Sequence, residues 1–324
     1  MSIILVLLLA FAGWAAWYLF VPYQAYANET FVELEYGTSA QNLAATLEKA
    51  GVVRNRYSFL FWRALHPKAA LQAGEYRFDR PLTPAEVFDK IHRGAIYYEV
   101  LAVPEGSNLF DIAQSLGGLR YIKPADFIAA ASDPSLVRDL DPAAPSLEGY
   151  LFPSSYRITR KTTAKDLCRA MVDQFQREWR RISAGLDNPD VHRIVTLASL
   201  VEKETAVPAE RPLIASVFQN RLRRNMALQC DPTVVYAALR ENKYRGAIYR
   251  SDLASNDPYN TYEHLGLPPG PIANPGAVSL TGALHPAETD YLYFVAKPGS
   301  VGQHTFSATL TEHQMAVKAY RGGR

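Results

Sequence analysis

An unbroken apolar run near the N-terminus constrains this chain most. Residues 3–21 are aliphatic, aromatic or small and carry no charge. A run of this length can cross a bilayer as one helix, and Pro22 then ends it. A cleaved signal peptide is the alternative, because Ala25-Tyr26-Ala27 resembles a small-residue cleavage site. The run is longer than a signal core and lacks a basic leader, so we expect residues 1–22 to be an uncleaved anchor that contacts lipid through residues 3–21.

The segment that follows indicates the side of the membrane on which the chain lies. No Lys or Arg precedes Lys49, so the positive-inside rule has little to count. Almost the whole chain follows the apolar run, which favours a single-pass protein whose bulk is exported. The acidic residues Glu29, Glu33 and Glu35 fit the outer face.

Composition excludes several classes of function. The chain has 324 residues, which suggests about two domains. Its 34 basic and 32 acidic residues produce no field that would attract nucleic acid. Cys168 and Cys230 either pair or stay free, and no Cys/His cluster has metal-ligand spacing. There is no P-loop and no GxGxxG motif, so we expect neither a metal nor another cofactor.

Two similar stretches organise the N-terminal half. Residues 32–47 and 101–116 each read as a short strand, a Gly turn, a Thr or Ser cap and a helix. Between them we expect a helix over 58–65, a strand over 74–78 and a helix that opens with a capping box at Thr83.

The region 29–95 therefore resembles the LysM-like regions found beside cell-wall enzymes, where a small strand and helix unit packs against glycan. A spacer is the alternative interpretation. Residues 96–145 would form a second β-turn-α unit and a linker, since Pro142 and Pro145 punctuate the chain there.

Glu204 is the strongest candidate for chemistry, because it is an acid on the apolar side of an expected helix. Ile194, Leu197, Leu200 and Val201 form one stripe at helical spacing, and Glu204 continues it. Burial would raise the pKa of its carboxyl, as a general acid near neutrality requires.

The neighbours of Glu204 provide the alternative interpretation. Glu202 lies at the edge of the stripe and Lys203 points away, so Glu204 alone is expected to be partly desolvated. A half-buried Glu204 held by Arg211 or Arg221 would be structural instead, because ion pairs also perturb pKa values.

Residues 146–324 complete an expected α+β fold: one transmembrane helix, a small LysM-like α/β subdomain and a mixed α+β catalytic domain. We expect helices over 164–182, 212–222 and 311–320, and a further helix entered at Asp231. A buried apolar strand is expected over 291–296 and an edge strand or turn over 302–307. Tyrosines and amides crowd the Pro- and Gly-rich loops at 255–276, which suits sugars; a well-ordered surface loop is the alternative.

These residues resemble the endolytic murein transglycosylases, the YceG-like family. The motifs that carry the resemblance are 147–153 (LEGYLFP), 198–205 (ASLVEKET), 217–222 (VFQNRL), 228–236 (LQCDPTVVY), 259–262 (YNTY), 266–272 (GLPPGPI), 285–286 (HP) and 291–295 (YLYFV). The resemblance implies that Glu204 is catalytic. Residues that would hold the sugar or orient the acid are Glu148, Asn220, Gln229, Asp231, Thr233, Tyr236, Asn260, Thr261, Tyr262 and His304.

The resemblance also implies location and substrate. It indicates an inner-membrane protein with its catalytic domain in the periplasm, cutting nascent peptidoglycan glycan strands within the chain and leaving 1,6-anhydro ends. Peptidoglycan synthases would be partners. Cys230 stands where a small polar residue such as Thr or Ser is expected. The alternatives are a hydrolytic muramidase and a noncatalytic wall-binding scaffold.

Overall fold

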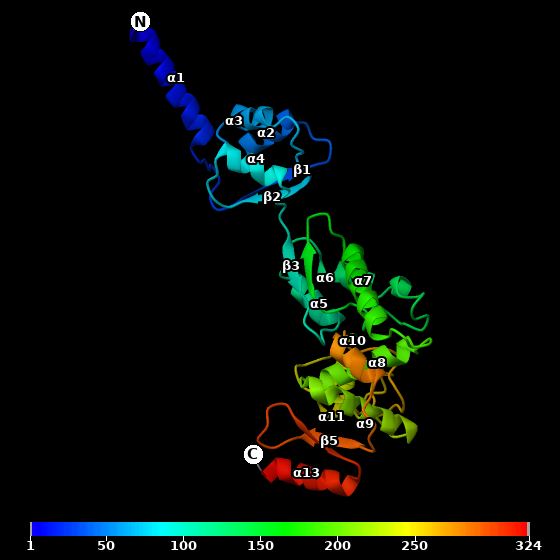
Figure 1. Ribbon diagram of the computed structural model, residues 1–324. Coiled ribbons are helices and arrows are strands. Elements are labelled where there is room, and N and C mark those ends of the chain that lie inside the picture. The colour runs from blue at the N-terminus through cyan, green and yellow to red at the C-terminus, as the bar shows by residue number, and fades with distance from the viewer. Residues whose placement is uncertain (1, 323–324) are drawn as a thin grey trace. The chain divides into compact units, whose positions relative to one another are not determined.

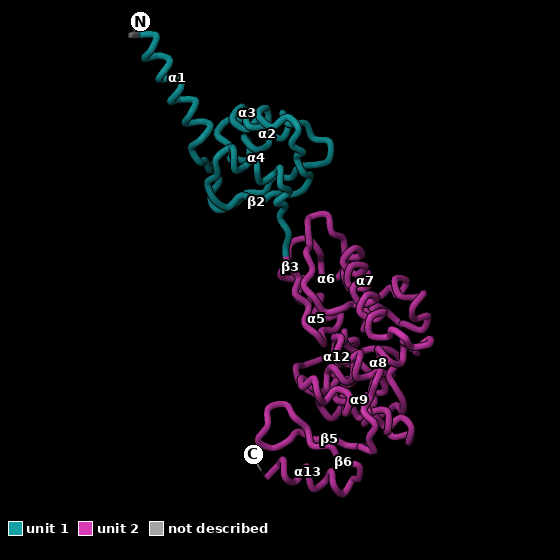
Figure 2. The backbone as a smooth tube through the Cα atoms, viewed as in Figure 1, with its two compact units in different colours: residues 1–99 teal, residues 100–324 magenta. Residues whose placement is uncertain are grey.

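The chain folds as two compact units of mixed α and β structure. The computed structural model describes residues 2–322. The units are Met1–Glu99 (unit 1) and Val100–Arg324 (unit 2), which Figure 2 colours separately. The α+β class predicted from sequence is confirmed.

Unit 1 begins with the predicted apolar helix. Helix α1 (Ser2–Phe20) has no polar face, and Ile3–Phe20 is long and apolar enough to cross a membrane. It ends two residues before Pro22, as expected for a helix stopped by proline.

The rest of unit 1 is a two-stranded sheet with helices on one face (Figure 1). The strands are antiparallel, with Val32 opposite Tyr76. Side-chain caps at Ser39, Asn55 and Thr83 begin the three helices, and Thr83 forms the predicted capping box. The elements are β1 (Thr30–Leu34), α2 (Ala40–Lys49), α3 (Arg56–Leu65), β2 (Gly74–Phe78) and α4 (Pro84–His92).

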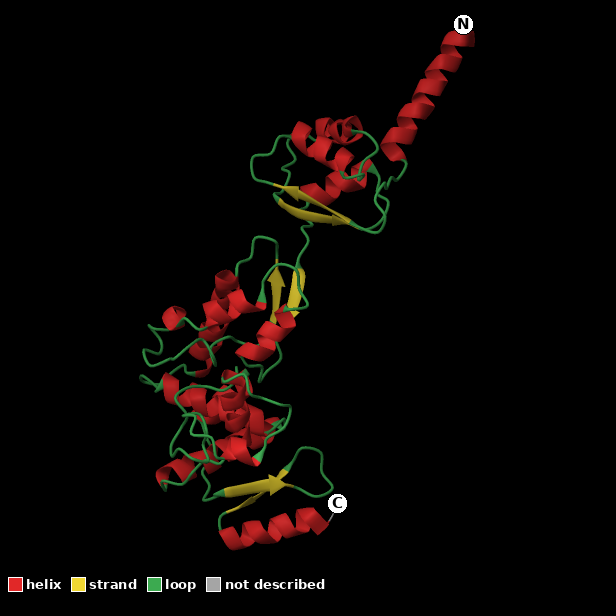
Figure 3. Cartoon of the chain, turned by 180° about the vertical axis from the view of Figure 1, so that it is seen from behind, coloured by secondary structure: helices red, strands yellow, loops and turns green. Residues whose placement is uncertain are grey.

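Unit 2 places helices between two strand pairs, which lie at opposite ends of the unit (Figure 3). Its first elements are β3 (Glu99–Ala102), α5 (Leu109–Leu116), α6 (Pro124–Ala131), β4 (Ser155–Ile158), α7 (Ala164–Ile182) and α8 (Val191–Glu204). Short 3₁₀ helices occur at Pro134–Leu136 and Pro208–Glu210. The remaining elements are α9 (Arg211–Arg223), α10 (Asp231–Arg240), α11 (Arg250–Leu253), α12 (Ala277–Leu284), β5 (Tyr293–Ala296), β6 (His304–Ser307) and α13 (Leu310–Gly322).

One hydrophobic core joins segments that the sequence separates. Leu101, Ile112 and Phe127 belong to the same buried cluster as Leu147 and the helices after it. Residues 100–145 therefore lie inside unit 2, because α6 packs between α5 and α7. The units divide near residue 99 rather than at the prolines, which occupy turns within unit 2.

Three local predictions differ from the structure. The apolar strand expected to be buried is β5, which pairs only with β6 among the described residues and is half-buried, because α13 covers the hairpin. The second β-turn-α unit is capped by Asn108, not by Ser107. Helix α8 is buried on all sides from Val195 to Val201, since α9, α10 and α12 surround it.

Candidate active site

Glu204 is the last residue of α8, where a buried helix reaches the surface of unit 2. Val201 is fully buried, whereas Thr205 is already extended, with φ −142° and ψ 136°. Glu204 is half-buried and lines two cavities. The helix thus delivers one carboxyl from the core to a place that a ligand can reach.

A cysteine thiol holds this carboxyl. The Sγ of Cys230 donates to Oε1 of Glu204 over 3.0 Å. Cys230 is 1% exposed and precedes α10, and its backbone N–H donates to the Thr261 hydroxyl over 3.0 Å. Cys168 and Cys230 are both free thiols. A small polar residue such as Thr or Ser was expected at position 230, and the cysteine that stands there still provides a hydrogen-bond donor.

Burial raises the pKa of the Glu204 carboxyl. Desolvation is the largest effect on its pKa and raises it. The Cys230 hydrogen bond lowers the pKa, the negative charge of Asp231 raises it, and the positive charges of His304 and Arg221 lower it. The net pKa is raised, which suits a general acid near neutrality.

The two cavities beside Glu204 differ in their walls. One, of about 410 Å³, is lined by residues from the β3–α5 turn and the end of α8: Glu105, Gly106, Glu202, Lys203, Glu204, Thr205, Ala206 and Arg211. The other, of about 260 Å³, is lined by Glu204, Arg221, Leu228, Gln229, Asp231, Tyr262, Phe294 and His313. We refer to the second as the acid cavity.

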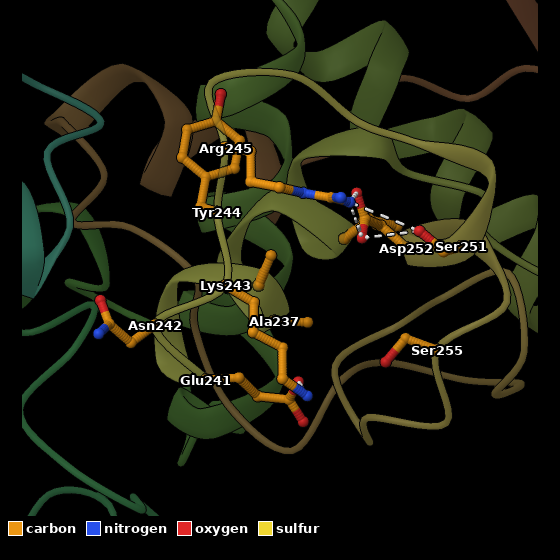
Figure 4. Close-up of a pocket in the computed structure, with 11 residues that line it drawn as sticks. Ala237, Glu241, Asn242, Lys243, Tyr244, Arg245, Ser251, Asp252 and Ser255 are labelled. Atoms are coloured by element: carbon orange, nitrogen blue, oxygen red, sulfur yellow. Dashed lines mark hydrogen bonds and ion pairs between the residues drawn. The ribbon is translucent and has the colours of Figure 1, made fainter.

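A larger hollow lies elsewhere in unit 2. It measures about 610 Å³ and is formed by the end of α10 and the segment leading to α11, without Glu204 (Figure 4). Arg245 and Asp252 form an ion pair across it, with 3.1 Å between Nη2 and Oδ1. Its charged groups are thus engaged with each other.

The arginines predicted as alternative partners of Glu204 are used otherwise. Arg211 pairs with Glu202 over 2.9 Å, and their side chains are 6% and 5% exposed. The prediction that only Glu204 is desolvated was wrong, because this pair buries Glu202 as well. Arg221 donates to the carbonyls of Leu292 and Leu228 over 2.7 and 2.8 Å. It reaches Glu204 through its charge alone.

Three predicted binding residues share the acid cavity with Glu204, namely Gln229, Asp231 and Tyr262. The Tyr262 hydroxyl donates to Asp231 over 2.5 Å. Gln229 has φ 50°, a conformation that is uncommon for a residue with a side chain and that clusters at functional sites.

Glu148 and Tyr236 lie behind the site, in the interior. Glu148 is 1% exposed and accepts from Leu109 N and Asn274 Nδ2 over 3.0 and 2.9 Å. Desolvation raises its pKa to about 8, and Tyr236 bonds to the same carboxyl. Asn274 also accepts from the N–H of Gly149. Glu148 therefore holds the Pro-rich loop instead of facing a cavity.

Four more predicted residues form supports. Thr233 and Thr261 share a 2.9 Å hydrogen bond behind Cys230. Asn260 donates to the carbonyls of Leu253 and Ser255, and Asn220 to those of Thr289 and Tyr291. Buried donors used in this way fix loops and present nothing to a ligand.

His304 is placed near the acid but bonds elsewhere. Its Nδ1 lies 2.7 Å from Glu210 Oε2, and its backbone N–H donates to the same carboxyl over 2.8 Å. It acts on Glu204 through charge. Phe294 and His313 line the acid cavity and were not predicted as site residues; they come from β5 and α13, far along the chain. Phe294 falls within the 291–295 motif, whereas no motif marks His313. Residues 2–322 hold no group of His, Cys, Asp or Glu that could bind a metal ion.

The fold and the site define a mixed α+β protein in which an acid with a raised pKa, Glu204, stands at the end of a buried helix beside two cavities. The model of the YceG-like family matches residues 32–319. The endolytic murein transglycosylase of Bacillus subtilis (strain 168) is 35% identical over 307 residues, covering 89% of this chain and 84% of the relative. The chain belongs to the YceG-like family.

Two further relatives agree with this. The endolytic murein transglycosylase of Streptococcus pneumoniae (strain D39) is 32% identical over 82% of this chain, which spans 54% of that relative's length. The crystal structure of a yceG-like protein from Listeria monocytogenes matches with a TM-score of 0.57 and 32% identity, covering 89% of this chain and 99% of that one.

Proposed function

We propose that the chain is an endolytic peptidoglycan lytic transglycosylase with Glu204 as its catalytic residue. It cleaves the β-1,4 bond between N-acetylmuramic acid and N-acetylglucosamine within glycan strands. Membership of the YceG-like family supports the activity. The observation that carries the assignment of Glu204 is its raised pKa beside two cavities, without an ion-pair partner among the described residues.

In the first step Glu204 acts as general acid. Its carboxyl gives a proton to the glycosidic oxygen as that oxygen leaves C1 of the muramic acid, and positive charge develops on the ring. Because the Cys230 thiol donates to Oε1, the transferable proton belongs on Oε2. The negative charge of Asp231 lies near enough to oppose ionisation of Glu204 before the transfer.

In the second step the same residue acts as general base. Ionised Glu204 takes the proton of the muramic acid 6-hydroxyl while that oxygen attacks C1. The new C1–O6 bond closes a 1,6-anhydro ring, and Glu204 regains its proton without water. The charges of Arg221 and His304 and the Cys230 donor stabilise the carboxylate between the two steps.

A hydrolytic muramidase is the second candidate, and Asp231 favours it. This carboxylate shares the acid cavity with Glu204. Ordinary glycosidases use two carboxylates, of which the second activates water or attacks C1. Asp231 accepts from Tyr262 in the free protein, which occupies one of its oxygens.

The test compares two neighbouring glutamates in the full-length chain, solubilised in detergent and supplied with purified glycan strands. Glu204→Gln should abolish cleavage, while Glu202→Gln, which changes the carboxylate paired with Arg211, should retain it. Mass analysis of the products identifies the ends. Anhydro ends support transglycosylation and reducing ends support the muramidase. Cleavage that survives in a folded Glu204→Gln variant refutes the assignment of Glu204.

The location and the accessory regions belong to the same proposal. Helix α1 anchors the chain in the inner membrane and the catalytic unit lies in the periplasm, supported by the apolar character of α1. Residues 29–95, with the order β-α-α-β followed by α4, act as a LysM-like glycan-binding subdomain. If the chain cuts new glycan strands beside the peptidoglycan synthases that make them, the cut would end the elongation of those strands. A noncatalytic scaffold would bind strands and cut none.

A further inference from the structure

Helix α3 carries an apolar stripe on its outer face. Tyr57, Phe61 and Leu65 follow one another at four-residue spacing and are 71%, 40% and 55% exposed. Ser58 and Phe59 are the buried residues of the helix, and Phe59 lies on the face opposite the stripe. The outer face of a surface helix is usually polar, and a contiguous exposed apolar patch marks an interaction surface.

The stripe lies beside the end of α1. The rings of Phe20 and Trp62 are 6.1 Å apart, and Trp62 is 5.9 Å from Phe61. The Arg54 guanidinium lies over Trp17 at 3.6 Å. Aromatic and basic side chains of this kind concentrate where a membrane helix leaves the hydrocarbon region.

The charged residues of the segment that contains α3 have one sign. Between Glu48 and Glu75 the chain has no acidic residue, and its basic residues there are Lys49, Arg54, Arg56, Arg63 and Lys68. Arg56 is paired with Glu48. An apolar face flanked by basic side chains fits an interface with anionic lipid headgroups.

We propose that α3 lies along the surface of the bilayer that α1 crosses, with Tyr57, Phe61 and Leu65 against the acyl chains and the basic residues at the phosphates. The inference rests on the proposed anchoring of α1. The bilayer is favoured over a second copy of the chain because the stripe lies beside the end of α1 and because its own segment, residues 49–74, contains basic and no acidic residues. With two contacts, α1 and α3, unit 1 is held at a fixed tilt to the membrane.

Spin labels on single introduced cysteines test the proposal in the full-length chain. The chain is reconstituted in vesicles of phosphatidylcholine alone or mixed equally with phosphatidylglycerol. In separate variants a labelled cysteine replaces Tyr57, Phe61 or Leu65 of the stripe. A label at Leu9 in α1 is the lipid reference, and a label at Tyr36, which is 96% exposed, is the water reference. The chain without an introduced cysteine gives the background of Cys168 and Cys230, which are buried.

Collision rates with oxygen and with a water-soluble nickel complex report the surroundings of each label. We expect oxygen to dominate at the stripe and at Leu9 and nickel to dominate at Tyr36, with deeper immersion of the stripe when phosphatidylglycerol is present. Nickel dominating at the stripe while oxygen dominates at Leu9 overturns the inference and leaves the anchor intact. Nickel dominating at Leu9 overturns both. Loss of both collision rates at the stripe means that protein covers it, which also overturns the inference.

Discussion

Replacing Cys230 by alanine is the sharpest perturbation of the proposed chemistry, because it removes one hydrogen bond from Glu204 and no charge. The thiol donates to Oε1 over 3.0 Å. Burial and the neighbouring Glu204 raise the pKa of the Cys230 thiol well above its ordinary value, so the thiol stays a donor at working pH. It bonds more strongly to the carboxylate than to the neutral acid, and therefore lowers the pKa of Glu204.

The size of the effect follows from the strength of the bond. Hydrogen bonds to charged groups contribute about 1.5–3 kcal/mol, and a thiol is a weak donor, so we take about 1 kcal/mol. This corresponds to about 0.7 pH unit. Since catalysis begins from protonated Glu204, kcat/KM should fall as the pH rises through the pKa of the free enzyme. We call this fall the falling limb of the pH profile, and in Cys230→Ala it should lie about 0.7 pH unit higher than in the wild type.

The assay is the pH dependence of kcat/KM for glycan cleavage by wild type, Cys230→Ala and the control Cys168→Ala. Cys168 is a buried free thiol in α7, so the control creates a similar small cavity in the same core. Both variants should lose about 1 kcal/mol of stability. A limb that stays in place or moves to lower pH in Cys230→Ala refutes the role of the thiol, as does an equal shift in Cys168→Ala.

The other predictions concern charge and burial around the same helix. Asp231→Asn removes a negative charge that raises the pKa of Glu204, so the falling limb should move to lower pH, opposite to Cys230→Ala; loss of kcat at every pH would instead favour the muramidase. Arg211→Met strands the buried carboxylate of Glu202 and should cost about 3–5 kcal/mol in urea titrations, with at least half recovered by adding Glu202→Gln; no recovery would contradict the pairing. Burial raises the pKa of Glu148 from 4.5 to about 8, so the folded chain binds this proton more tightly and stability should fall as the pH rises between those values; urea titrations across the interval that show rising stability would contradict it.

Local signals in the sequence predicted most elements but few long-range contacts. The bounds expected for residues 164–182 match α7, because a Thr163 capping box opens it and its apolar face is regular. Helix α12 was not predicted, since it follows a Pro- and Gly-rich stretch that indicates a loop. Its packing against α8 is a tertiary contact that no local pattern encodes.

The candidate site shows the same limit. Sequence indicates that Glu148, Asn260 and Gln229 are polar residues in or near loops, but not which of them face a ligand. That distinction depends on partners far along the chain: Asn274 binds Glu148 across 126 positions and Ser107 across 167. Of these three residues, only Gln229 lines the acid cavity, because the other two carry their hydrogen bonds inside the protein.

Glu202 and Glu204 show why surroundings, and not residue type, decide which acid can react. Both belong to the last turn of α8, and both side chains are shielded from solvent by burial. Glu202 receives the Arg211 guanidinium over 2.9 Å and the Gly276 N–H over 2.9 Å, so its charge is compensated and it is fixed as a structural carboxylate. Glu204 receives only a weak thiol donor, and desolvation leaves its pKa raised. The ion pair fixes Glu202 in place, whereas Glu204, with its raised pKa and without such a partner among the described residues, is suited to give a proton to a leaving oxygen.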